Sequence, residues 1–197
     1  MNASLTARTA PIPVLVGAIL MLSADSAAAQ ASPGDWLLVG GPLYAAQPSF
    51  AGDARGAGLQ AGVTLGLPRA LTLGADITTI RLFPENGHGS EENEPVAQPF
   101  GAHAIHLGVG ANVDVFTVIP WLQLAPGLWL EGPATEGGGR SIRPGVRISV
   151  GFDHRPSRSW STGAALSWST FGPDWTDLPD RVTFALRFGW LRSASAL

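Results

Sequence analysis

Five charged side chains interrupt stretches in which apolar and small residues alternate. They are Asp76, Glu131, Arg143, Arg147 and Arg187, and each falls on the small, polar side of its stretch. Opposite charges inside a narrow protein must pair, because an unpaired charge is costly to bury. We therefore expect Asp76 to bind Arg147, Arg187 or both, and Glu131 to bind Arg143. Such pairs would either plug the interior or, by exchanging partners, gate a narrow ion path.

An acidic stretch lies between residues 83 and 101. It carries four glutamates and one histidine, namely Glu85, Glu91, Glu92, Glu94 and His88. Clustered carboxylates can bind Ca²⁺, but this spacing matches no EF-hand. We predict a solvated connection, with no metal and no cofactor anywhere in the chain.

An enzymatic alternative would need a histidine close to a serine, as in lipid hydrolases and acyltransferases. His103 and Ser169 are the only pair that suggests itself, and they fall on opposite predicted faces. His103 and His106 also lie on opposite faces of one stretch, which makes them a poor metal pair. The sequence therefore predicts no catalytic residues, and a lipid-modifying enzyme remains only an alternative.

The charges sit on extended segments whose period is two residues. Between Gly58 and Leu67 the apolar residues Leu59, Val63 and Leu65 share one side, while glycine, glutamine and threonine occupy the other. This alternation is typical of a β-strand with one apolar face. Similar alternation recurs along the chain and predicts eight strands: Trp36–Ala46, Gly56–Leu67, Ala70–Leu82, Ala102–Val115, Thr117–Glu131, Ile142–Asp153, Trp160–Thr170 and Val182–Trp190.

The connections between these strands are alternately long and short, and each strand is near the length that a tilted membrane strand needs. Together these features predict an all-β fold, an eight-stranded antiparallel up-and-down transmembrane β-barrel. Prolines weaken the first and fifth strands, because proline removes a hydrogen-bond donor from the ladder. They are Pro42, Pro120 and Pro126.

The apolar faces are predicted to contact lipid, because the opposite faces are mostly glycine, serine, threonine and charged residues. We expect these residues to face lipid: Leu59, Val63, Leu107, Val109, Leu124, Ile148 and Leu186. Aromatic side chains should form belts at the two membrane surfaces. We place Phe116, Phe152, Trp160 and Trp190 at the periplasmic rim, and Phe83 and Trp168 near the outer one. A soluble secreted barrel with this exterior would be prone to aggregate and is the fallback.

The first 29 residues are predicted to be a signal peptide. Arg8 precedes a short apolar segment, Pro11–Leu22, and Ala27–Ala29 offers a cleavage site. Residues 30–197 then form one barrel domain without cysteine, and a net charge of −3 argues against nucleic acid as a partner.

The last predicted strand alternates to a terminal aromatic residue, Val182-Thr-Phe-Ala-Leu-Arg-Phe-Gly-Trp190. In this strand and in its topology, the chain resembles the small eight-stranded outer-membrane barrels of the OmpA/OmpX kind. The resemblance implies insertion into outer-membrane lipid by the barrel-assembly machinery, and localisation in the bacterial cell outer membrane. We expect a monomer with a structural or surface-interaction role and a lumen plugged by paired charges, the alternative being a narrow channel for ions or small solutes.

Overall fold

The structure is a computed structural model that describes residues 33–47, 53–84, 98–113, 117–133, 139–157, 159–171 and 181–192. The predicted signal peptide, the glutamates and histidine of the acidic stretch, and Phe116 lie outside these ranges. No helix in the described part of the chain is long and apolar enough to cross a membrane.

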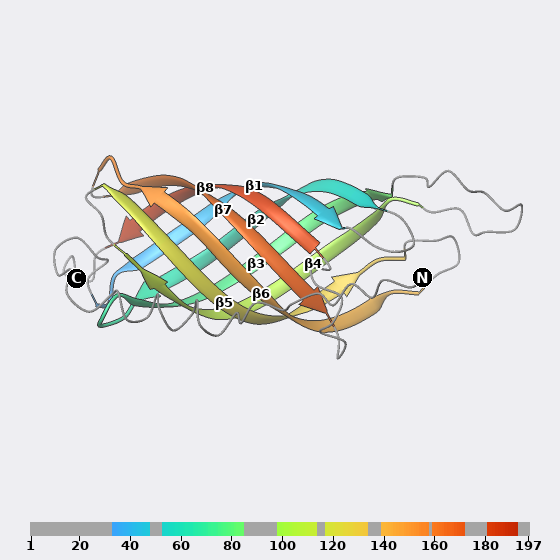
Figure 1. Ribbon diagram of the computed structural model, residues 1–197, viewed down its shortest axis with the longest axis horizontal. Coiled ribbons are helices and arrows are strands. Elements are labelled where there is room, and N and C mark those ends of the chain that lie inside the picture. Colours follow the sequence, from blue (N-terminus) through green and yellow to red (C-terminus); the bar gives the residue numbers. More distant parts are fainter. Residues whose placement is uncertain are drawn as a thin grey trace, which may run out of the picture.

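Eight antiparallel strands close into one barrel in which each strand pairs with its neighbours in sequence, and β1 pairs with β8 (Figure 1). The strands are β1 (Trp36–Gln47), β2 (Ala54–Gly66), β3 (Leu71–Pro84), β4 (Phe100–Asn112), β5 (Val118–Glu131), β6 (Ser141–His154), β7 (Trp160–Phe171) and β8 (Arg181–Arg192). The predicted fold class is confirmed, and the predicted strand ends differ from these by at most three residues. The largest difference is in β4, which ends at Asn112 instead of Val115.

The two ends of the barrel differ. The connections 67–70, 113–117 and 155–159 are short and lie at one end, where β1 begins and β8 finishes. The connections 48–53, 85–99, 132–140 and 172–180 are longer and lie at the other end. We call these the turn end and the loop end, on the left and right of Figure 1. In outer-membrane barrels short turns face the periplasm and long loops face outward.

Two of the three prolines predicted to weaken strands interrupt the sheet on one side only, whereas Pro120 pairs with Phe152 of β6 beside no break in the ladders. Pro42 pairs with Leu59 of β2, but the β1–β8 ladder skips the two residue pairs around it. Pro126 pairs with Val146 of β6, while the β4–β5 ladder skips two pairs beside it. Because each strand keeps an intact ladder to its other neighbour, the missing proline donor does not break the strand.

The outer wall carries a broad apolar surface. Five of the seven residues predicted to face lipid are exposed there, from Leu186 at 46% to Leu59 at 66%, while Val63 and Ile148 share the outward face but are half-buried. Exposed aromatic side chains gather at the turn end, where Trp160 pairs with Trp190 across the strands and Phe152 lies on β6. A soluble protein rarely exposes apolar patches of this extent, so the surface indicates a membrane band.

Candidate functional site

The lumen holds three tiers of charged side chains. Strand β6 runs from the loop end to the turn end and contributes one residue to each tier. In that order these are Arg143, Arg147 and Asp153. An eight-stranded barrel is only wide enough for its own side chains to fill, so each tier spans the lumen. The paired charges expected in the lumen are therefore present.

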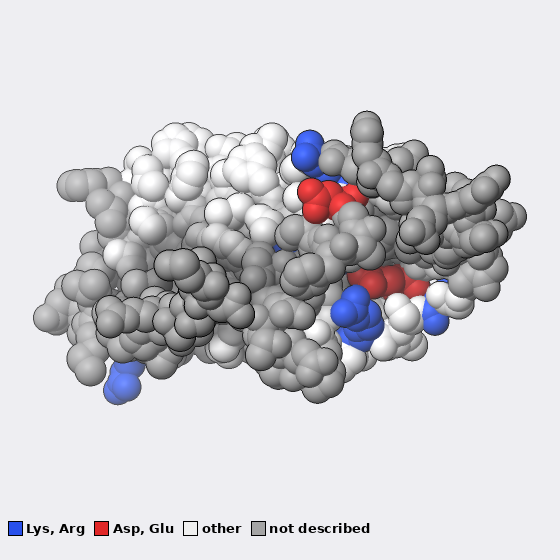
Figure 2. All heavy atoms as spheres, turned by 45° about the vertical axis from the view of Figure 1, so that its right-hand side comes forward, with Lys and Arg blue, Asp and Glu red and all other residues white. Residues whose placement is uncertain are grey.

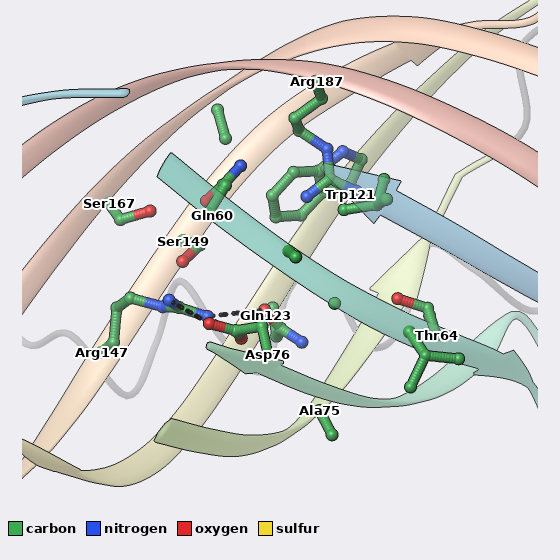
Figure 3. Close-up of a pocket in the computed structure, with 15 residues that line it drawn as sticks. Gln60, Thr64, Ala75, Asp76, Trp121, Gln123, Arg147, Ser149, Ser167 and Arg187 are labelled. Atoms are coloured by element: carbon green, nitrogen blue, oxygen red, sulfur yellow. Dashed lines mark hydrogen bonds and ion pairs between the residues drawn. The ribbon is translucent and has the colours of Figure 1, made fainter. Parts of the chain in front are cut away.

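The middle tier joins Asp76 of β3 to Arg147 of β6 (Figure 3). Arg147 donates from Nη1 to Asp76 Oδ1 at 2.8 Å and from Nη2 to Asp76 Oδ2. His106 Nδ1 lies 3.1 Å from Asp76 Oδ1, and Gln123 Oε1 lies 3.4 Å from Arg147 Nη2. The carboxylate thus accepts a two-pronged bond from the guanidinium, the strongest geometry for such a pair.

The rings in the lumen need glycine opposite them. A Cβ on Gly127 of β5 would lie 2.5 Å from Cδ2 of His106, and a Cβ on Gly151 of β6 would lie 2.5 Å from Cζ2 of Trp121. Backbone carbonyl oxygens of Ile105 and Ala164 would lie equally close to these Cβ atoms, so no side chain fits there without moving the ring and the neighbouring strand. The small residues on the inward face therefore make room for the groups that form the tiers.

The turn-end tier contains Asp153 of β6 and Arg187 of β8, which sequence reasoning did not pair. Arg187 Nε lies 3.0 Å from Asp153 Oδ1. The Arg187 guanidinium carbon lies 4.3 Å from the centre of the Trp121 ring, and Figure 3 shows these two side chains beside each other. Arg187 thus binds Asp153 instead of Asp76, the alternative partner expected from the sequence. Asp153 shares the inward face of its strand with Arg147, and this shared parity was the available signal.

The loop-end tier centres on Arg181, the first residue of β8, whose side chain is fully buried. Its Nη2 lies 2.6 Å from Glu131 Oε1 and 2.6 Å from Gln47 Oε1. The predicted pair of Glu131 and Arg143 is present at 3.4 Å, with Arg143 half-exposed. Arg181 is the stronger partner of Glu131, and it was missed because the predicted strand began one residue later, at Val182.

Aromatic rings connect the loop-end tier to the middle tier. The Trp129 ring meets Phe171 and His106 edge-on, each at 5.1 Å between ring centres. The Arg181 guanidinium lies 4.7 Å from the centre of the Trp129 ring, a distance typical of a cation–π contact. Trp129 is 1% exposed, so the rings close the lumen at this level.

The apolar core of the protein lies at the loop end, around these rings. Buried side chains there include Ile80, Leu82 and Phe100. Ile80 and Leu82 lie on the inward face of β3, the same face as Asp76. The outward face of β3 at the same height carries Thr79 and Arg81. At the loop end, apolar side chains of β3 thus turn inward and pack around the buried Arg181–Glu131 pair, while the outward face of the wall carries both polar residues and exposed apolar ones such as Phe83.

Two small cavities lie among the described residues of the lumen, toward the turn end. One of about 30 Å³ lies between Asp76, Arg147 and Arg187, and the other of about 40 Å³ lies between Asn112, Asp153 and Arg187. Each has room for a water molecule or two. Within the described ranges, no group of three or more His, Asp and Glu side chains is placed to hold a metal ion.

The candidate hydrolase pair is not brought together. His103 is exposed on the outer wall of β4, whereas Ser169 of β7 is buried on the inward face, opposite Arg147. A nucleophile and its base must lie within hydrogen-bond reach, so these two residues cannot act as a dyad.

A scan against protein-family models finds no match, and no curated protein is significantly similar in sequence. Among solved structures, the Neisserial surface protein A is 16% identical, covering 80% of this chain and 97% of that one, with a TM-score of 0.59. OprG of Pseudomonas aeruginosa is 10% identical, with 84% and 99% covered and a TM-score of 0.60. Ail, the attachment invasion locus protein of Yersinia pestis, is 12% identical, with 81% and 99% covered and a TM-score of 0.54. The chain therefore has the fold of small bacterial outer-membrane barrels.

Proposed function

We propose that this chain is a monomeric outer-membrane barrel with a structural or surface-interaction role and no catalytic activity. One observation carries the proposal: the loop-end half of the lumen is filled by packed side chains, with Arg181 and Trp129 at its centre. Ions would have to displace these buried groups in order to pass. What distinguishes the loop end is instead its long connections, which suit contact with molecules outside the cell.

Conductance separates this proposal from the narrow channel. We expect the parent chain, inserted in planar bilayers, to carry no stepwise current. Current through the parent, or current that Asp76→Asn or Arg147→Gln raises, would favour a gated channel instead.

Orientation is the second requirement of a surface role. An epitope inserted in the connection 85–99 should bind antibody on intact cells, whereas an epitope added after Leu197 should bind only after the outer membrane is permeabilised. Both tags inaccessible on intact cells, with the barrel folded, would argue against a surface role.

A further inference from the structure

The outer wall has a hollow among its described residues that is larger than the two lumen cavities described above. It lies at the loop end, has a volume of about 400 Å³, and is lined by residues of β3, β4 and β5 and by the ends of two connections. The residues that matter here are Arg81, His103, Leu130 and Arg140. We call this hollow the wall pocket.

Among its described residues, the wall pocket is basic. No described Asp or Glu lines it, and no ion pair or hydrogen bond joins Arg81 or Arg140 to another described side chain. Both arginines are exposed, unlike Arg147 and Arg181, which bind carboxylates in the lumen. Figure 2 shows blue and red side chains lying together toward the loop end of the visible face, beside uncharged described residues.

The imidazole of His103 is oriented toward this pocket. Thr79 Oγ1 lies 3.2 Å from His103 Nδ1, and a Cβ on Gly101, which also lines the pocket, would lie 3.5 Å from His103 Nε2. The second ring nitrogen therefore lies along the pocket wall, where it is available to a ligand.

The pocket lies at the upper edge of the apolar band. Across β3 and β4, Ile77 pairs with Ile105, and the next outward pairs are Thr79 with His103 and Arg81 with Gly101. On β3 and β4 the outward face thus changes from apolar to polar within one row, while Leu130 and Ile142 keep the same row apolar on β5 and β6. Four residues of a tilted strand climb about 10 Å, so Arg81 lies close to the level of the lipid headgroups.

From this position we propose that the wall pocket binds the phosphate group of an outer-leaflet lipid headgroup. Two guanidinium groups and one imidazole supply donors for several phosphate oxygens, a match that favours a phosphomonoester over a neutral headgroup. Exposed Leu128 and Leu130 continue the pocket downward and offer an apolar wall for the acyl chain. The apolar wall is the reason to choose a lipid over free phosphate, and the inference rests on the proposed insertion in the membrane.

Lipid titration of the folded chain in dodecyl maltoside tests the inference, with bound lipid counted by native mass spectrometry. The probes are dioleoyl phosphatidic acid, phosphatidylglycerol and phosphatidylcholine, with inorganic phosphate as competitor. We expect phosphatidic acid to bind about tenfold more tightly than phosphatidylcholine, and the variant Arg81→Gln, Arg140→Gln to lose about tenfold in affinity.

A matched control removes the same charge at the turn end, through the exposed pair Arg69→Gln, Arg192→Gln, and should leave binding unchanged within about twofold. If the double variant does not fold, the single variant Arg140→Gln replaces it, because Arg140 lies in a connection and not in a strand. If the control variant lost as much affinity for phosphatidic acid as the Arg81→Gln, Arg140→Gln variant, general charge attraction would explain the binding, and the proposed binding at the wall pocket would be wrong. Equal binding of all three lipids, or competition by inorganic phosphate at the concentration of lipid, would overturn the lipid headgroup as its ligand.

Discussion

Replacing Asp76 by asparagine removes the only carboxylate of the middle tier and leaves Arg147 without its partner. The Arg147 side chain is 9% exposed, and its remaining oxygen partner, apart from the altered residue, is Gln123 at 3.4 Å. The new amide NH₂ group would also face one of the guanidinium nitrogens, donor against donor.

Breaking a buried ion pair by removing one member costs about 3–5 kcal/mol. The cavity of about 30 Å³ beside Asp76 and Arg147 admits a water molecule, which compensates part of the loss. We therefore expect Asp76→Asn to lower the free energy of unfolding by about 3 kcal/mol, the lower end of that range. The double variant Asp76→Asn, Arg147→Gln buries no lone charge, so it should lose only about 1–2 kcal/mol.

Urea unfolding of the chain in lipid vesicles, followed by tryptophan fluorescence and extrapolated linearly, gives these free energies. Asp53→Asn is the matched control, because this aspartate is exposed, and it should change stability by less than about 0.5 kcal/mol. If Asp76→Asn were as mild as this control, or if the double variant were worse than the single one, the tier would not act as a buried ion pair.

Three further predictions concern the wall and the packing. Val109→Arg, in the apolar band, should lower the free energy of unfolding in lipid by about 2–4 kcal/mol, whereas Thr79→Arg, just above the band, should lower it by less than about 1 kcal/mol; equal losses would contradict the assigned band. Gly151→Ala should destabilise the barrel by about 1–3 kcal/mol, because its methyl group meets the Trp121 ring; unchanged thermal stability would contradict this. In single-tryptophan variants, Trp160 should be quenched most by probes at headgroup depth, and strongest quenching from the bilayer centre would refute its place at the turn-end rim.

The sequence predicts the eight strands because alternation fixes which side of a strand each residue occupies. It also places Asp76, Arg147 and Arg187 in the lumen. Alternation does not give the height of a residue in the barrel, because height depends on how the strands are staggered. For this reason the sequence left Arg147 and Arg187 as alternative partners of Asp76, whereas the structure brings Arg147 to it and Arg187 to Asp153.

The loop-end core was not predicted, for a related reason. Ile80 and Leu82 share the inward face with Asp76, so the rule that apolar residues face outward fails at the end of β3. That rule holds only where lipid surrounds the wall. Beyond the membrane, water surrounds it, and the apolar side chains turn inward as in a soluble protein.

The two proline-interrupted ladders have a mechanical consequence. They lie between β1 and β8 and between β4 and β5, so the unbroken ladders group the wall into two half-shells of four strands each, on opposite sides of the barrel axis. A force that flattens the cylinder would strain these two seams before any other part of the wall. Two contacts of the charged tiers join the half-shells from within: Arg147 of β6 binds Asp76 of β3, and Arg181 of β8 binds Gln47 of β1. These two contacts act as internal cross-braces between the half-shells, whereas the Asp153–Arg187 pair lies within one of them.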